Sequence, residues 1–249
     1  MKGRFQMVDI KETVSIMDID FLKVTKNELM KEMLLPALVN GERRFIVTAN
    51  PEIVMKARQD ASYRQAVQRA DYTIADGIGI VKAADWKGEP LPERIAGYDV
   101  MRNLLQIAEE KGYSCFFLGA AEEVNERAVQ EVKRLHPNLK IAGRHHGFFE
   151  LKDDTVLEQV KTANPDMVFV ALGLPRQENW IAKHLDQFEK GLFMGVGGSF
   201  DVLAGEVKRA PGIWIKLNLE WAYRALRQPA RILRLMTVFH FMFLARFKK

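Results

Sequence analysis

The feature of this sequence that most constrains its fold is a regular alternation, from about residue 44 onward, of short apolar runs with longer amphipathic stretches. The apolar runs have the length of buried strands, and they lie at residues 45–47, 72–75, 115–118, 139–142, 167–172 and 192–196. The stretches between them have helical periodicity, as in residues 122–136, which place apolar side chains on one face before Pro137. This alternation predicts an α/β fold with a mostly parallel sheet that helices cover on both faces.

The alternation stops near residues 205–212, and the remainder of the chain has a helical and strongly basic pattern. We therefore predict an α/β domain over residues 1–205 and a helical appendage over residues 206–249. Residues 208–249 contain ten Lys or Arg and one acid, Glu220, whereas the preceding residues contain 27 basic and 31 acidic side chains. Such a segregation of charge indicates an anionic partner for the appendage, either a membrane or a nucleic acid.

The appendage combines its basic residues with apolar bulk. Arg224, Arg227, Arg231 and Arg234 recur at spacings that place them on one helical face, and residues 235–247 are rich in Phe and Met. This combination is typical of a helix in a membrane interface. An apolar end would have no role on a nucleic acid, so we expect membrane binding and no nucleic-acid partner. The alternatives are a core-packing helix with a solvated basic face, and self-association of the apolar tail.

The expected location follows from what the sequence lacks. No apolar stretch reaches the ~18 to 20 residues that a membrane-spanning helix needs, and residues 1–10 lack the apolar core of a signal peptide. The single cysteine, Cys115, cannot form an internal disulfide, and its apolar neighbours indicate a buried strand position rather than a catalytic thiol. We expect a cytoplasmic protein that is peripheral on the inner face of the cell membrane.

Glycines and polar residues follow the predicted strands. Because the carboxyl ends of parallel strands meet at one edge of the sheet, we expect these turns to form a cleft there. Gly119, Gly173, Gly197 and Gly198 would let the backbone approach a phosphate or a base closely, and Pro175 suits a helix start whose N–H groups attract anions. A tight turn would also explain any one of these glycines. Three such turns at one edge favour a nucleotide.

The glycines do not match a dinucleotide-binding fingerprint. In residues 195–200, Phe200 stands where G-x-G-x-x-G requires its third glycine. The turn after Leu118 has one glycine only. A NAD-dependent dehydrogenase is therefore disfavoured.

Asp76 is the candidate catalytic residue, since it follows a buried run and precedes a glycine, which should direct its carboxylate into the expected cleft. A single carboxylate there can act as a general base toward a hydroxyl group. The alternative for Asp76 is a helix N-cap. Thr48 and Asn50 end the neighbouring strand and are candidates to orient a substrate or the acid, although a β-former and a turn residue would also fit. Arg94 is a candidate phosphate ligand, with a surface salt bridge as the alternative.

We predict no metal site. Asp18 and Asp20 match a D-x-D that can hold a divalent ion between diphosphate oxygens, but they lie outside the α/β region. His145 and His146 have no Cys or Glu at ligand spacing, and adjacent residues on a strand face opposite ways. A diphosphate leaving group would then be stabilised by helix N-termini and arginines.

Several segments, in this order, resemble the WecG/TagA/CpsF glycosyltransferase family over nearly the whole chain. They are VTANPE at 47–52, ADGIG at 75–79, RIAG at 94–97, FLGA at 117–120, GLPRQENW at 173–180, GVGGSFD at 195–201 and EWAYRALRQP at 220–229. Each segment alone would be weak, whereas together they are specific.

The resemblance implies a Rossmann-like core, an inverting glycosyltransferase that needs no metal or other cofactor, and a membrane-associating appendage. The closest likeness is to the branch that transfers N-acetylmannosamine from UDP-ManNAc to undecaprenyl-diphosphate-linked GlcNAc, in the synthesis of the wall teichoic acid linkage unit. Related enzymes with another donor, such as UDP-ManNAc uronate or UDP-glucose, are the alternative. A non-enzymatic alternative is a membrane-tethered nucleotide-sugar sensor, which would tolerate Asp76→Asn.

Residue roles carry over by position. The resemblance implies that Asp76 is the base, that Gln177 contacts the donor, and that arginines of the appendage close over the diphosphate. The substrate-binding residues that we expect are Thr48, Asn50, Arg94, Gly119, Gly173, Gln177, Gly197, Gly198, Asp201, Arg224 and Arg227.

Overall fold

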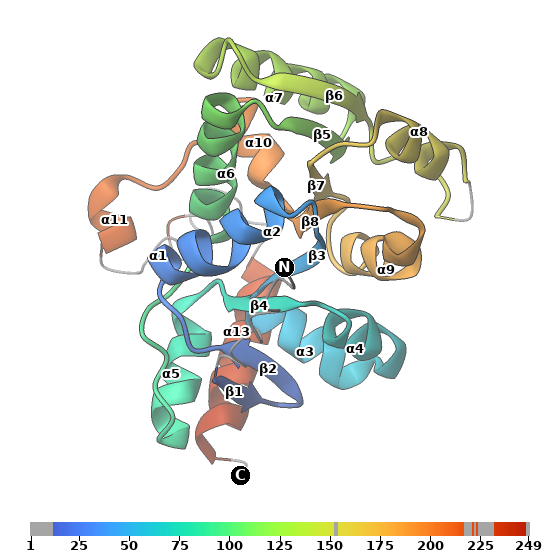
Figure 1. The fold of residues 1–249 in the computed structure, drawn as a ribbon. Coiled ribbons are helices and arrows are strands. Elements are labelled where there is room, and N and C mark those ends of the chain that lie inside the picture. The colour runs from blue at the N-terminus through green and yellow to red at the C-terminus, as the bar shows by residue number, and fades with distance from the viewer. Residues whose placement is uncertain (1–11, 152–153, 217–220, 222, 224–231, 248–249) are drawn as a thin grey trace.

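The computed structural model describes residues 12–151, 154–216, 221, 223 and 232–247. Its centre is a sheet of six strands in the order β4-β3-β8-β7-β5-β6 (Figure 1). The strands are β3 (Arg43–Ala49), β4 (Tyr72–Ala75), β5 (Ser114–Gly119), β6 (Lys140–His145), β7 (Met167–Ala171) and β8 (Gly191–Gly195). Every pairing is parallel. The α/β fold class and all the strands predicted from apolar runs are confirmed.

Helices cover both faces of the sheet. One face packs against α3 (Pro51–Gln59), α4 (Ala61–Gln68), α5 (Ile78–Lys87), α8 (Thr155–Ala163), α9 (Arg176–His184) and α13 (Ile232–Phe247). The other packs against η1 (Leu29–Leu34), α2 (Leu35–Val39), α6 (Gly97–Lys111), α7 (Glu122–Leu135) and α10 (Ser199–Leu203). Among the described elements, three short helices lie outside these two groups, namely α1 (Lys26–Glu28), η2 (Leu185–Gln187) and α11 (Gly212–Lys216). The central strands β7 and β8 are buried along their whole length, which is why they read as continuous apolar runs.

Helix α7 shows how far the periodicity predicts packing. Ala128, Val129 and Val132 are buried on the face that the sequence pattern indicates. Leu135 belongs to the same face but is 46% exposed. It is the last residue of the helix, so its side chain gains less cover than those of the preceding turns.

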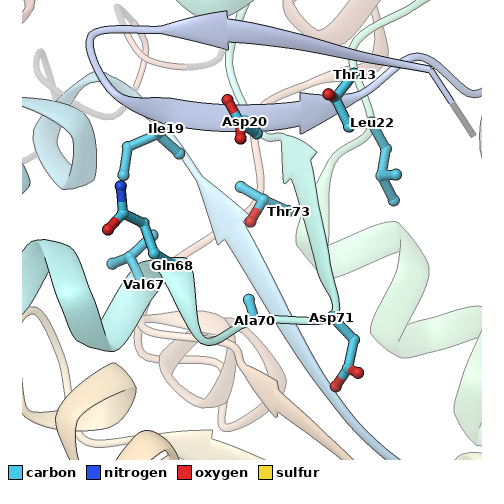
Figure 2. Close-up of a pocket in the computed structure, with 9 residues that line it drawn as sticks. All are labelled: Thr13, Ile19, Asp20, Leu22, Val67, Gln68, Ala70, Asp71 and Thr73. Carbon is cyan, nitrogen blue, oxygen red and sulfur yellow. The ribbon is translucent and has the colours of Figure 1, made fainter. Parts of the chain in front are cut away.

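A β-hairpin that the sequence did not suggest precedes the main sheet. Strands β1 (Thr13–Ile16) and β2 (Ile19–Leu22) pair antiparallel, and the turn between them places Asp18 at a φ of 67°. Asp18 forms an ion pair with Arg64, 3.3 Å between Oδ2 and Nη1. Asp20 instead lines a hollow of about 320 Å³ between the hairpin and β4, together with Thr73, whereas the Asp71 carboxylate points away and accepts a hydrogen bond of 2.7 Å from the Phe45 N–H (Figure 2). The two aspartates of the D-x-D thus have different surroundings, away from the carboxyl edge of the main sheet.

Within the appendage, residues 206–211 have no regular structure, and the helices α11 and α13 follow. Helix α13 packs against α3 and α5 (Figure 1), and its Phe241 and Leu244 side chains are buried in the core. On its other side Met236, Phe239 and Phe243 are each more than half exposed. The core-packing interpretation therefore holds for one side of α13, whereas the exposed side is apolar rather than basic, and membrane binding stays a prediction. Among the residues described, no helix is both long enough and apolar enough to cross a membrane.

Candidate active site

The topology fixes where a ligand site can lie. Strands β3 and β8 are neighbours, but the helices that follow them lie on opposite faces of the sheet, α3 on one and α10 on the other. In open α/β sheets, ligands bind outside the carboxyl ends of the strands at such a point. Thr48 of β3 joins the two strand ends, because its Oγ1 donates a hydrogen bond of 3.1 Å to the Gly195 carbonyl of β8.

Asp76 lies beside this point, directly after β4. Its N–H donates a hydrogen bond of 2.9 Å to the Ala49 carbonyl of β3, which fixes its backbone to the sheet edge. Its carboxylate Oδ2 accepts a hydrogen bond of 3.1 Å from the Gly97 N–H, and Arg94 Nε lies 4.0 Å from Oδ1. The Asp76 side chain is 33% exposed. The carboxylate is therefore held in place and still accessible.

The helix-capping roles differ from the sequence-based alternatives. Helix α5 begins at Ile78 with Gly77 as its N-cap, so the N-cap interpretation of Asp76 is wrong. Asn50 is the N-cap of α3, and its Oδ1 accepts a hydrogen bond of 3.0 Å from the Ile53 N–H. Asn50 thus has a local structural role, but as a helix N-cap rather than as a turn residue. Its cap places it one residue beyond β3, at the same edge as Asp76.

Arg94 is not a surface residue. Its side chain is 12% exposed, and its guanidinium group forms an ion pair with the carboxylate that we expect to react. The salt bridge that was the alternative for Arg94 is therefore present, but it is partly buried at the site rather than on the surface. A cation in this position favours the ionised form of a neighbouring carboxylate and can also attract a phosphate group.

Gly97 makes the closest approach in this cluster. A Cβ atom at this position would lie 2.8 Å from Thr48 Cγ2 and 3.2 Å from Asp76 Oδ2. The absence of a side chain thus lets the first turn of α6 reach both residues and bring its N–H to the carboxylate. Sequence reasoning noted Gly97 as part of a motif but missed this contact, because it joins segments that are distant in the chain.

We expect Gly97→Ala to lower catalytic activity by about tenfold or more, since the methyl group would push Thr48 and Asp76 apart and small misplacements of reacting groups are costly. Overpacking should also reduce the free energy of unfolding by about 1–3 kcal/mol. Initial rates and urea unfolding would be measured. Gly212→Ala is the matched control, because Gly212 also begins a helix and a Cβ there meets nothing within 4 Å. Equal activity of the two variants would contradict the prediction.

The glycine turns that we expected to bind a nucleotide differ in what they require. Gly119 has a φ of 124°, and a Cβ there would lie 2.4 Å from the Ala171 carbonyl oxygen, so this position accepts only glycine. Gly173 and Gly197 also have positive φ, 74° and 49°. Gly198, the N-cap of α10, has a φ of −74°, and glycine freedom is not needed there. The close packing of the strands therefore requires glycine at position 119, whether or not this turn also binds a ligand.

Gln177 and Asp201 lie in the first turns of the helices that follow β7 and β8. Gln177 lies in the first turn of α9 and is 5% exposed, and its Oε1 accepts a hydrogen bond of 3.1 Å from the Gly197 N–H. Its own N–H donates to the Gly173 carbonyl at 3.0 Å. Gln177 therefore joins two of the predicted glycine turns. Asp201 is half-buried in the first turn of α10.

The structure describes Cys115 and the two adjacent histidines but not Arg224 or Arg227 of the appendage. Cys115 is fully buried in β5, and burial raises the pKa of its thiol, so the structural interpretation holds. The rings of His145 and His146 lie 4.5 Å apart, and the expectation that they face opposite ways is wrong because β6 ends at His145. No group of three His, Cys, Asp or Glu side chains with metal-binding geometry occurs among the described residues. The arginines Arg224 and Arg227 lie outside the described residues.

Comparison with known proteins gives consistent matches. The model of the glycosyl transferase WecG/TagA/CpsF family matches residues 14–249. The N-acetylglucosaminyldiphosphoundecaprenol N-acetyl-beta-D-mannosaminyltransferase of Staphylococcus aureus strain MW2 is 42% identical over 231 residues, which cover 92% of this chain and 91% of the relative. The protein of the same name from strain NCTC 8325 / PS 47 is also 42% identical, with the same coverage.

Proposed function

Because this chain belongs to the WecG/TagA/CpsF family of glycosyl transferases, we propose that it transfers N-acetylmannosamine from UDP-ManNAc to undecaprenyl-diphosphate-linked GlcNAc. Membership of this family means that the chain is a glycosyltransferase. The sugar and the acceptor come from the names of relatives that are 42% identical over nearly the whole chain. Transfer of ManNAc uronate or glucose by the same site remains the competing choice of donor.

The observation that carries the proposal is the position of Asp76 at the carboxyl end of β4. The residue is fixed to β3 through its backbone, its carboxylate accepts the Gly97 N–H, and its side chain is one-third exposed. A base of this kind must reach the acceptor hydroxyl while its own orientation is held. Thr48 and Asn50 stand at the end of the adjacent strand and are proposed to line the acceptor and sugar pocket.

The proposed reaction is a single displacement. The acceptor hydroxyl oxygen attacks the anomeric carbon of the donor, and its proton passes to the Asp76 carboxylate. The bond between the anomeric carbon and the β-phosphate oxygen breaks, and UDP departs with the electron pair. Attack from the opposite face inverts the anomeric configuration.

UDP is proposed to leave without help from a metal. Glycines 119, 173, 197 and 198 would bring backbone close to the nucleotide, and Gln177 and Asp201 would contact it from the helix starts behind these turns. Arg94, Arg224 and Arg227 would balance the diphosphate charge. The observation that supports part of this arrangement is the link from Gln177 to both the Gly173 and the Gly197 turns.

We also propose that the appendage binds the inner leaflet of the cell membrane, where a lipid-linked acceptor would be presented. The exposed side of α13 supports this, because Met236, Phe239, Phe243 and Phe247 are each 58% exposed or more. These residues recur every three or four positions and therefore form one apolar stripe. Basic residues of the same appendage would add attraction to anionic lipid.

The test is acceptor-dependent UDP release by the purified chain with EDTA present. UDP-ManNAc, UDP-ManNAc uronate and UDP-glucose would each be offered with a lipid-diphosphate-linked GlcNAc in anionic vesicles. We expect release with UDP-ManNAc at least about tenfold faster than with the other two, a ratio that corresponds to ~1.4 kcal/mol of discrimination. A preference for another donor would replace the sugar in the proposal. Loss of activity in EDTA would overturn metal independence, and binding of UDP without any transfer would favour the sensor.

A further inference from the structure

A buried carboxylate lies directly behind the candidate site. Glu178 follows Gln177 in the first turn of α9 and is 1% exposed. Its Oε2 accepts a hydrogen bond of 2.9 Å from the hydroxyl group of Tyr63, which is fully buried on α4. Its Oε1 accepts a hydrogen bond of 2.7 Å from Gln177 Nε2. A carboxyl group at such depth is expensive to bury, and burial raises the pKa of Glu178.

Hydrogen bonds link this carboxylate to the site, because the Gly197 N–H donates to Gln177 and Gln177 donates to Glu178. Because Glu178 Oε1 acts as an acceptor, it selects the Gln177 amide orientation in which Nε2 points toward it. Gln177 Oε1 must then point the other way, where it accepts the Gly197 N–H at 3.1 Å. With the opposite orientation, the amide N–H groups of Gln177 would face the N–H group of Gly197 and would find no acceptor there.

The same pair packs tightly against the end of β8. A Cβ atom at Gly195 would lie 2.8 Å from Gln177 Nε2 and 3.3 Å from Glu178 Oε1. The carbonyl of Gly195 in turn accepts the hydrogen bond from Thr48, the residue that contacts Gly97 beside Asp76. The buried carboxylate therefore lies against the end of β8, and the same residue, Gly195, is hydrogen-bonded to Thr48.

We propose that Glu178 is a positioning residue for the donor: held by Tyr63, it sets the amide orientation of Gln177 and thereby the conformation of the Gly195–Gly198 turn that receives the UDP group. Glu178 contacts no substrate in this proposal and acts through Gln177. The inference rests on the proposed function, since it assumes that this turn binds UDP.

The test is the affinity of the full chain for UDP, measured by calorimetric titration for the parent, Glu178→Gln, Tyr63→Phe and Trp180→Phe. Gln at position 178 has nearly the shape of Glu but carries an N–H₂ group, which would compete with Gln177 Nε2 and favour the wrong amide orientation. We expect the UDP dissociation constant of Glu178→Gln to rise about tenfold. Tyr63→Phe removes one oxygen atom and should raise the UDP dissociation constant about threefold. The KM for the donor should rise in parallel while the KM for the acceptor stays unchanged.

Trp180→Phe is the matched control for a purely structural effect. Trp180 is 1% exposed on the same helix, and its ring contacts those of His184 and Phe188. We expect it to lower the melting temperature with no change in UDP affinity. Equal weakening of UDP binding in Trp180→Phe and Glu178→Gln would overturn the inference, as would parent-like binding in both Glu178→Gln and Tyr63→Phe. Should Glu178→Gln not fold, Tyr63→Phe alone decides. A parent chain that fails to bind UDP would overturn the proposed function itself.

Discussion

Replacement of Asp76 by Asn is expected to lower the turnover number by a factor of about 10² to 10⁴, the contribution of a positioned general base. An amide cannot take the proton of the acceptor hydroxyl, whereas its oxygen can still accept the N–H of Gly97 that binds Asp76 Oδ2 at 3.1 Å. The substrate should therefore still bind, and the loss should fall on the turnover number. Acceptor-dependent UDP release under saturating substrates would measure it.

Two controls separate loss of the base from loss of the fold. Asp85→Asn removes a nearby carboxylate that is exposed on α5, and its turnover should match that of the parent. The UDP dissociation constant of Asp76→Asn should stay within about twofold of the parent value, because the variant keeps the size of the side chain. If Asp76→Asn released UDP at the parent rate, the base would lie elsewhere in the site.

The main sheet could be predicted because its strands carry an unambiguous signal. A strand buried on both faces must be apolar at every position, and β7 and β8 are of this kind. The β1–β2 hairpin carried no comparable signal. Its strands have four residues each, and β1 alternates between exposed and buried residues, which is the pattern of a half-buried strand but is too short here to decide the assignment.

The candidate site could be predicted in part, because the carboxyl end of each strand is read directly from the sequence. Asp76, Thr48 and Asn50 were found in this way, and their strands are neighbours in the structure. The contacts between them were not readable, since Gly97 approaches Thr48 from a distant segment. The same holds for Tyr63 and Glu178, which are 115 residues apart and meet only because α4 and α9 pack together. Glu178 did lie in a recognised motif, but nothing local to it indicated burial.

The appendage lies closer to the chemistry than its position in the chain suggests. Helix α13 packs on α3 and α5, the helices that begin beside Asn50 and Asp76. At Gly79, in the first turn of α5, a Cβ atom would lie 3.4 Å from Met242 Sδ and 2.9 Å from Pro51 Cγ. One side of α13 thus packs on the helices that begin at the candidate site, while its other side is exposed. A surface that binds the exposed side of α13 would therefore contact a helix that already packs on the catalytic domain.

The second large effect is expected from Gly119→Ala, which should reduce the free energy of unfolding by more than about 4 kcal/mol. Gly119 pairs with Ala171 across β5 and β7, and an added Cβ would lie 2.4 Å from both the carbonyl carbon and the carbonyl oxygen of Ala171. These are backbone atoms of a buried strand, so they cannot rotate away as a side chain could. A loss of this size is a large part of the ~5 to 15 kcal/mol that keeps a typical domain folded.

Steric overlap with Ala171 and backbone strain would both contribute to that loss of stability. The variant Gly173→Ala separates these two causes. Gly173 also has a left-handed φ, 74° against 124° for Gly119, but a Cβ there meets nothing within 4 Å. It should therefore show the backbone strain alone, a cost of about 1–3 kcal/mol. Urea unfolding of both variants would measure the difference, which we assign to overlap between β5 and β7. If the two variants lost equal stability, the close approach of the Gly119 turn to β7 would not be what requires glycine there, and a role in ligand binding would become the better account of this residue.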